Sequence, residues 1–500
     1  MMRKHIVFLL CTLPLAYALT LSSCNKENFT DDASVRLTFS TDTILFDTVF
    51  TTMGSTTRRM KIYNTEDDYV MISEISLRRG ENSPYSINVD GVAGKMIHDI
   101  EMAPHDSIFL FAKVRIDPTN SNSPLIEEDD VFFKINGNTQ NVKLLAWGQD
   151  AHYIIAKDTL SYNPDYGATK YCIVAHEHEV IRWTPDKPYV IVGGFAAVDS
   201  LGILEIMAGT QVYLDNRSGI WVYPHGNIKV LGEADNEVVF QSIHKDDYYE
   251  GKTGLWDRIW INESPYRHVI ENAIIKDGFI GIQAENLYFR EFYEHNLVLR
   301  NVKIENMSGY GLYASFFSID VGNVLIDNCG NNLMYLTGGG YYDVRHCTMA
   351  NFWNKSGRDA EAVRIENYLN VYGEGRVPAP INDYNFENCI VYGSKENELS
   401  IDKIESAPMN CMFYNCLLKV NGENALNYNN YFTNCIVNKS PLFADSSQAN
   451  FHLDTIVSPA YLSGRNETLN FYIDIAKDLD GVSRTINDKP DIGVYQFVND

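Results

Sequence analysis

The feature that most constrains the fold of this chain is a short segment that recurs seven times in its second half. Each copy begins with a polar residue, has a small apolar residue at the next position and another apolar residue two positions further on. The copies start 29, 22, 23, 42, 27 and 19 residues apart, a scatter around roughly two dozen residues that is typical of solenoids. The seven copies are Asn272-Ala273-Ile274-Ile275, Asn301-Val302-Lys303-Ile304, Asn323-Val324-Leu325-Ile326, His346-Cys347-Thr348-Met349, Asn388-Cys389-Ile390-Val391, Asn415-Cys416-Leu417-Leu418 and Asn434-Cys435-Ile436-Val437.

The two apolar positions of each copy lie on the same side of a strand, because side chains alternate between faces. Stacked copies therefore place Ala, Val and Cys side chains above one another inside a narrow coil, where a free cysteine behaves as a small apolar residue. The leading Asn tolerates the left-handed conformation that a sharp corner needs, and its amide can bond to the copy above. The pattern predicts a buried cysteine column and an asparagine ladder.

A second regularity precedes these copies, between residues 201 and 243, where strand-like runs of three to six residues alternate with single glycines. Together the two regions resemble the right-handed parallel β-helix proteins of the pectate-lyase-like group, and in particular Bacteroidota surface lipoproteins that pair a sandwich domain with such a helix. The resemblance implies an all-β chain with a right-handed parallel β-helix over 191–498. It rests on Ala208-Gly209-Thr210, Gly254-Leu255-Trp256-Asp257-Arg258-Ile259-Trp260, the Asn-Cys copies, Ser458-Pro459-Ala460, Asp478-Leu479-Asp480-Gly481 and Pro490-Asp491-Ile492-Gly493-Val494-Tyr495.

The interval of 42 residues between His346 and Asn388 is too long for one turn of such a coil. We therefore expect an excursion near 352–383 that projects from the coil. It carries Trp353, Lys355 and Arg358, which we predict to contact a ligand.

Residues 1–23 read as a secretory signal peptide, with a basic start and an apolar run that is short for a membrane span. Leu21-Ser22-Ser23-Cys24 resembles the bacterial lipobox, which implies that Cys24 is lipidated and anchors the protein in the outer membrane. Residues 24–35 then form a tether, and their lysine and acidic residues resemble a signal for display on the cell surface.

Residues 36–150 contain short alternating runs separated by Asn, Gly, Pro and Asp, which predicts an immunoglobulin-like (Ig-like) β-sandwich. The runs are 57–63, 70–77, 97–102, 107–116, 131–135 and 141–147. We expect this domain to act as a spacer, and we expect 151–190 to be a connector.

The net charge and the cysteine pattern limit which partners and sites are expected for this chain. The formal charge of −24 opposes binding to phosphate backbones, so we expect no nucleic-acid partner. Seven cysteines lie after Cys24, an odd number that argues against a complete disulfide framework, and the chain has no CxxC motif. We predict no metal site and no cofactor, although a lyase activity would require Ca²⁺.

One charged column has the residue types that chemistry on acidic polysaccharides needs. Asp320 and Asp343 each lie three residues before a ladder position, so they are expected to stack on neighbouring strands. Arg300 and Arg345 immediately precede the ladder and flank Gly322. This column is either a solvated face of alternating charge or a catalytic site with Asp320, Asp343 and Arg345, with Arg300 as a binding residue.

Two hypotheses follow. The first is a surface-anchored, non-catalytic lipoprotein whose β-helix binds a glycan or an outer-membrane protein assembly. The alternative is a polysaccharide lyase or glycoside hydrolase acting on acidic polysaccharide.

Overall fold

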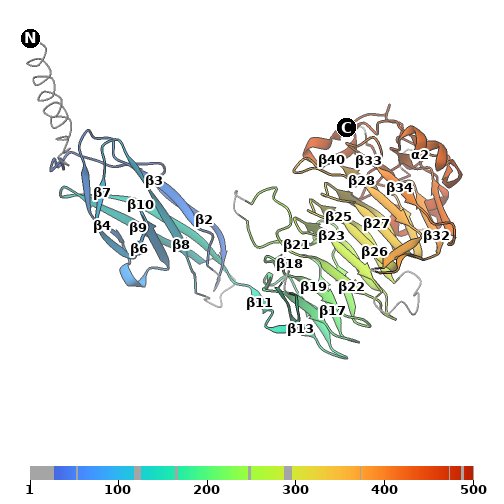
Figure 1. The fold of residues 1–500 in the computed structure, drawn as a ribbon, viewed down its shortest axis with the longest axis horizontal. Coiled ribbons are helices and arrows are strands. Elements are labelled where there is room, and N and C mark those ends of the chain that lie inside the picture. The colour runs from blue at the N-terminus through green and yellow to red at the C-terminus, as the bar shows by residue number, and fades with distance from the viewer. Residues whose placement is uncertain are drawn as a thin grey trace, which may run out of the picture. The chain divides into compact units, whose positions relative to one another are not determined.

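The computed structural model describes residues 28–51, 54–117, 125–163, 167–245, 249–286, 296–371, 373–471, 473–485 and 489–498. The predicted signal peptide and Cys24 lie outside these ranges. Strands dominate, so the chain is all-β, and the α-helices among the described residues are the short α2 (Gly422–Asn427) and α3 (Glu467–Phe471). None of the described helices has the length and apolar character needed to cross a membrane. The chain divides into two compact units, Met1–Asp150 and Ala151–Asp500 (Figure 1).

The first unit consists of two five-stranded sheets that share one apolar core. Their strands are antiparallel except for β2 and β10, which pair in parallel. Inward residues alternate with exposed ones, as in β8, where Ile108, Leu110, Ala112 and Val114 are buried. One sheet has the order β1 (Thr38–Phe39), β3 (Arg58–Tyr63), β8 (Ser107–Val114), β5 (Tyr85–Val89), β6 (Val92–Gly94), and the other β2 (Thr43–Phe50), β10 (Asn138–Gln149), β9 (Leu125–Ile135), β4 (Val70–Leu77), β7 (Met96–Met102).

The second unit is a stack of parallel strands in which each strand pairs with a strand about one turn later in the chain. For example, Val180–Trp183 pairs with Ile203–Met207, which pairs with Asn227–Leu231. The pairings form three columns, which we call A, B and C, and alternate side chains of all three point into one continuous apolar core. The long strands β23, β25, β26 and β27 bend at corners and contribute to more than one column.

Column A contains β13 (Gly167–Ala175), β16 (Phe195–Val198), β19 (Gly219–Val222), β22 (Ile259–Asn262), β24 (Ile282–Glu285), the start of β26 (Leu312–Asp327), the start of β27 (Met334–Arg345), β29 (Val363–Glu366) and β34 (Leu399–Asp402). Column B contains β14 (Val180–Trp183), β17 (Ile203–Met207), β20 (Asn227–Leu231), the start of β23 (His268–Lys276), the start of β25 (Leu297–Glu305), the middle of β26, the end of β27, β32 (Ile381–Glu387), β35 (Met409–Tyr414) and β37 (Phe432–Thr433). Column C contains β11 (His152–Ile155), β15 (Tyr189–Val192), β18 (Gln211–Leu214), β21 (Val238–Ser242), the ends of β23, β25 and β26, then β28 (Thr348–Asn351), β33 (Ile390–Gly393), β36 (Leu417–Leu418) and β38 (Ile436–Val437). Strand β12 (Asp158–Asn163) pairs antiparallel with β13 at one end of the stack.

The polar residue that starts each repeated segment lies at the corner between columns B and C, as predicted. All seven have φ between 47° and 55°, the left-handed region that asparagine tolerates. The amides form a ladder: Asn301 donates to Asn272 at 3.1 Å, and Asn323 donates to Asn301 at 3.0 Å. Further along, the Asn388 amide lies 2.9 Å from the ring of His346.

The cysteines that follow these corner residues form the expected internal column. Cys347, Cys389 and Cys416 have no exposed surface, and Cys435 at the end of the column is partly buried. The Cys389 amide lies 3.4 Å from the sulfur of Cys416, one strand away. These thiols are therefore core groups.

Two sequence predictions about the stack need correction. The expected connector (151–190) instead forms β11 to β14 and the first residues of β15, and it supplies the first strand of every column. The expected excursion (352–383) is interrupted by β29, which pairs in column A with Met334–Leu336 and with β34. What leaves the stack is a hairpin of β30 (Tyr368–Val371) and β31 (Gly375–Pro378), which pair only with each other.

The C-terminal segment returns along the outside of the stack. Strands β39 (Phe443–Asp445) and β40 (Asn450–Leu453) pack on outward side chains of column C, including Leu325 and Ile390, together with Ala460, Tyr461, Leu479, Ile492, Val494, Tyr495 and Phe497. Four residues of this segment lie over column B, namely Arg465, Thr468, Asp474 and Ile475.

Candidate functional site

The register brings the predicted charged residues of column B together. Asp320 pairs with Asp343, and Arg300 and Arg345 lie on either side of Gly322 in successive strands. The sequence therefore predicted correctly which of these residues are neighbours.

The contacts of these residues form a buried ion network. One oxygen of Asp320 accepts from Arg300 Nη2 at 2.6 Å, and its other oxygen contacts Arg345 Nη2. Arg345 also approaches Asp343 at 3.6 Å, and Arg300 Nε donates to Asp474 at 2.5 Å. Burial acts to lower the pKa of the Arg300 guanidinium, but the carboxylates of Asp320 and Asp474 outweigh it and the pKa is raised.

The C-terminal segment closes this network from outside. Ile475 is fully buried, and a Cβ atom on Gly322 would lie 2.7 Å from its Cγ2 atom. Thr468 donates to Glu387 of the same column at 2.6 Å. The side chains of Arg300 and Arg345 are 8% and 2% exposed, so the network is a contact between the stack and its C-terminal cover.

The three residues predicted to project from the coil do not do so. They are Trp353, Lys355 and Arg358. Trp353 is 9% exposed and its indole donates to Ser356 at 3.0 Å. Lys355 donates to the carbonyl of Gly251 and to Asn306, and its ammonium lies 5.6 Å from the Trp353 ring centre. Arg358 makes a two-pronged ion pair with the buried Glu398 at 2.7 and 2.8 Å. This corrects the expectation that the three residues project from the stack, because they close one of its corners.

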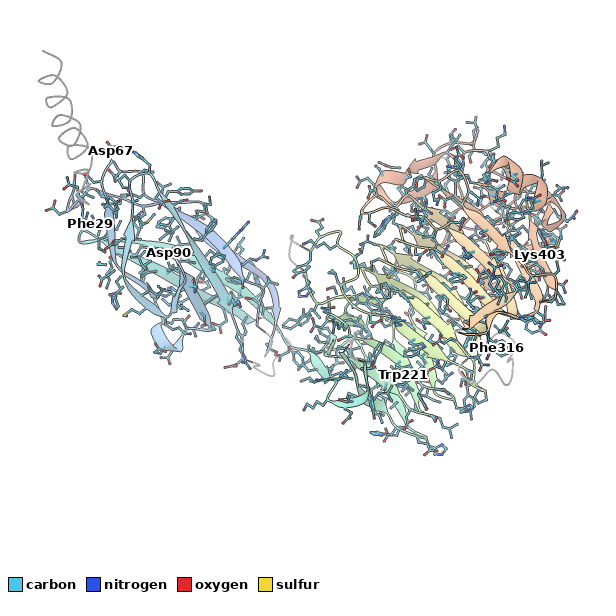
Figure 2. The ribbon with its side chains drawn as sticks, in the orientation of Figure 1. Phe29, Asp67, Asp90, Trp221, Phe316 and Lys403 are labelled. Atoms are coloured by element: carbon cyan, nitrogen blue, oxygen red, sulfur yellow. The ribbon has the colours of Figure 1, made fainter. Side chains whose placement is uncertain are left out.

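A different outward face, that of column A, gathers aromatic side chains in register. The register runs Trp221, Trp260, Gln283, Tyr313, Tyr335, Arg364 on six successive strands. We call these six residues the aromatic ladder. Trp221, labelled in Figure 2, is 5% exposed, and the other rings are half-buried.

A second line of outward residues lies two positions further along five of these strands and continues onto the next strand, β34. We call it the polar ladder, and it consists of Asn262, Glu285, Ser315, Thr337, Glu366 and Asp402. Lys403, labelled in Figure 2, directly follows its last member.

The polar ladder holds the aromatic rings by their polar edges. The Trp221 indole donates to Asn262 at 2.9 Å, and the Trp260 indole donates to Glu285 at 2.8 Å. The Tyr335 hydroxyl donates to Glu366 at 2.7 Å. In each case the ring on one strand bonds to the polar residue of the next strand, so the orientation of each ring is fixed before any ligand arrives.

The rings also contact one another along the stack. The centres of Trp221 and Trp260 are 5.1 Å apart with planes 17° from parallel, and those of Tyr313 and Tyr335 are 5.3 Å apart and tilted by 60°. Tyr310, from the adjoining corner, lies 6.0 Å from Tyr335. Burial raises the pKa of Tyr313 and of Tyr335, which keeps both phenols protonated as hydrogen-bond donors.

Glu366 connects this face to the projecting hairpin. It is fully buried and accepts from Arg364 Nε at 2.7 Å and from the Tyr368 hydroxyl at 3.0 Å. The same hydroxyl lies 2.8 Å from Asp402. The hairpin is thus anchored at the end of the aromatic ladder.

Sequence reasoning missed the aromatic ladder, although a signal for it exists. The pattern of an apolar residue, an outward residue, a second apolar residue and a polar residue recurs in column A. Its clearest copies are Ile282-Gln283-Ala284-Glu285, Leu312-Tyr313-Ala314-Ser315, Met334-Tyr335-Leu336-Thr337, Val363-Arg364-Ile365-Glu366 and Leu399-Ser400-Ile401-Asp402. Aligning these copies as the Asn-headed copies were aligned places the tyrosines in one line.

Within the described ranges, no group of three or more His, Cys, Asp or Glu side chains is placed to hold a metal ion.

Comparisons with known proteins assign this chain to no family. No family model matches the chain, and no curated protein matches it either. Three solved structures overlap it at a TM-score of 0.17, which carries no argument about fold or function. They are a PapD-like domain of human CEP192 (13% identity, 26% of this chain and 97% of that one), a family 123 glycoside hydrolase from Clostridium perfringens (7%, 29% and 26%) and a protein of unknown function from Porphyromonas gingivalis W83 (11%, 29% and 59%). This chain therefore spans less than two thirds of the second and third of these proteins.

Proposed function

We propose that this protein is a surface-anchored lipoprotein of the outer membrane whose second unit binds carbohydrate. In this proposal the second unit is a right-handed parallel β-helix, the first is an Ig-like spacer, and lipid on Cys24 is the anchor. The parallel pairing of each strand with one about a turn later supports the β-helix. The two sheets around one core support the Ig-like domain.

The observation that carries the binding function is the pre-oriented aromatic ladder. Trp260 and Tyr335 are half-buried, held at their polar edges by Glu285 and Glu366, and presented with Tyr313 on neighbouring strands. Aromatic rings with a fixed edge and an accessible apolar surface suit the apolar faces of sugar rings, and adjacent hydroxyls and carboxylates suit the sugar hydroxyls. A protein assembly of the outer membrane would also favour aromatic residues, but a narrow line of rings along one column suits a linear polymer better than a broad protein surface.

The alternative of a polysaccharide lyase or hydrolase acting through Asp320, Asp343 and Arg345 has weaker support. Asp320 is engaged by two guanidiniums, and Ile475 lies over Gly322 between them. A sugar could reach Asp320 and Arg345, whose side chains are buried, only if the C-terminal segment moved away.

A glycan array with the full chain tests the proposal. We expect binding to one or more polysaccharides, weakened at least tenfold by Trp260→Ala and by Tyr335→Ala. Tyr63→Ala, which removes a half-buried strand tyrosine from the first unit, is the matched control and should leave binding unchanged. Binding that survives both ladder variants, or no binding to any polysaccharide, would refute a carbohydrate site on this face.

The anchor is tested separately by fatty-acid labelling in cells. We expect label on the wild-type chain and none on Cys24→Ala. Label that persists in the variant would remove the proposed lipid anchor.

A further inference from the structure

We propose that the ligand of the aromatic ladder is an uncharged polysaccharide that lies along the stack, rather than a uronic-acid or sulfated polymer. This inference rests on the proposed carbohydrate-binding function and specifies its substrate class.

The charges of the two ladders oppose a polyanion. Three carboxylates, those of Glu285, Glu366 and Asp402, face one guanidinium, that of Arg364, among the twelve ladder residues. Arg364 is already engaged, because its Nε and Nη2 atoms both lie 2.7 Å from Glu366 Oε1. A polyanion needs unpaired Lys or Arg side chains along its path, and neither ladder supplies one.

Arginines at the margin of the face also already interact with other side chains of the protein. Arg258 lies 2.5 Å from Asp257 and contacts the side-chain oxygen of Gln283. Arg376 on the hairpin lies 3.4 Å from Asp402, with its guanidinium 4.4 Å from the Tyr368 ring centre. Each of these cations is therefore partly neutralised before a ligand binds.

The polar groups that remain suit hydroxyl donors. Glu285 is half-buried and accepts from Trp260 through Oε1, so among the described contacts its other oxygen is left to a ligand. Ser315 and Thr337, which lie between Glu285 and Glu366, are buried, and the Thr337 hydroxyl donates to the Tyr368 carbonyl at 2.6 Å. The half-buried carboxylate of Glu285, beside the rings, can accept a hydrogen bond from a hydroxyl of a neutral sugar chain.

The geometry of the stack suits an extended chain parallel to its axis. Neighbouring strands repeat at roughly 4.8 Å, close to the length of one pyranose unit in an extended polymer. Trp260 to Tyr335 covers three such steps, roughly 14 Å, enough for three or four units. Gln283 interrupts the rings in the second of the four strands and provides an amide where a ring would otherwise lie.

Affinity electrophoresis of the full chain through gels of defined polymers tests this inference. The neutral probes are laminarin, xyloglucan and mannan, and the anionic probes are polygalacturonate, alginate and chondroitin sulfate. We expect retardation by at least one neutral polymer, little change between low and high salt, and at least a tenfold loss of affinity in Tyr335→Ala. We expect no retardation by the anionic polymers.

The outcomes separate this inference from the function on which it rests. Retardation by an anionic polymer that weakens with salt and in Tyr335→Ala would leave carbohydrate binding intact and overturn the uncharged class. Retardation by none of the six polymers together with an empty glycan array would overturn both.

Glu285→Gln supplies a second measurement, because glutamine keeps an oxygen for the Trp260 indole. Glutamine replaces the oxygen left to the ligand with an amide N–H, from which a neutral sugar hydroxyl can accept instead of donating, so we expect affinity for the neutral polymer to fall by less than fivefold. A tenfold loss would mean that the carboxylate charge itself is recognised, as by an amino sugar, and would also overturn the uncharged class.

Discussion

Columns A and B are built from the same kind of strand in the same stack, yet their outward faces differ in whether the side chains are accessible to a ligand. In column B the outward charges of Arg300, Asp320 and Arg345 neutralise one another, and Ile475 covers them. In column A the outward rings of Trp260 and Tyr335 stay half-exposed, and each is held by a polar residue of the next strand. Charged residues in register are therefore weak evidence of a site, because they readily form a contact with another part of the chain.

The difference also concerns how each face is stabilised. The order of column B depends on a C-terminal segment that joins it through Asp474 to Arg300. The order of column A comes from hydrogen bonds between adjacent strands of the stack and, at Glu366, from the Tyr368 hydroxyl of the hairpin. A binding face that is ordered without a cover can receive a ligand without first losing a contact.

The largest expected effect is in column B. Asp320→Ala leaves Arg345 and Arg300 buried with fewer counter-charges, and we expect the free energy of unfolding to fall by about 3 to 5 kcal/mol. Glycan affinity of the folded protein should not change, since the network lies on column B and the aromatic ladder on column A. Urea unfolding and affinity electrophoresis measure the two quantities.

The control for this variant is Asp383→Ala, an exposed carboxylate of the same column, which should alter stability by no more than about 0.5 kcal/mol. If Asp320→Ala instead abolished binding or a polymer-cleaving activity at unchanged stability, the network would be a functional site and the contrast between the columns would fail.

The next effect comes from a buried histidine beside column A. His268 accepts from the Ile228 amide at 3.3 Å, and its other nitrogen lies 3.1 Å from the carbonyl of Asn262, which holds Trp221. Burial lowers the pKa of His268 to about 4. As the pH falls from about 6.5 to 4, unfolded histidine gains a proton that the folded one does not, so stability falls by about 3 kcal/mol over this window.

Urea unfolding of the wild type and of His268→Gln at pH 7 and pH 4.5 measures this effect. The buried His346 has a lowered pKa and acts in the same direction, but it is common to both proteins. We expect the variant to lose less stability than the wild type on acidification. An equal loss in the two proteins would show that His268 does not contribute.

The repeated segments illustrate how much of the fold could be predicted from sequence. The asparagine corners and the cysteine column were predictable because each lies at a fixed place in a local repeat, and the pairing of Asp320 with Asp343 followed from the same register. The strands at 151–190 were missed because they carry neither the Asn-headed segment nor the single-glycine corners that marked the later strands.

The candidate site was less predictable, for a physical reason. Whether an outward residue is free depends on segments distant in sequence, and Arg300 is contacted by Asp474, 174 residues later. Likewise, the long interval before Asn388 suggested that Trp353 projects, whereas its ring packs beside Gly330 of the preceding turn. Column A carried a readable repeat, but no single residue type is common to its outward positions, so the stronger asparagine signal hid it.

The smallest expected effect tests whether the polar ladder pre-orients the rings. Tyr335→Phe keeps the ring and removes only the hydroxyl that donates to the buried Glu366. Because the loss of one hydrogen bond to a charged acceptor loosens the ring without removing it, we expect glycan affinity to fall by about 1 kcal/mol, roughly fivefold. Titration calorimetry with the polymer selected by electrophoresis measures this, and Tyr63→Phe in the first unit is the control. If Tyr335→Phe bound as weakly as Tyr335→Ala, the hydroxyl itself would be the ligand contact. If it bound like the wild type, packing alone would set the ring orientation, and the polar ladder would not contribute to binding on column A.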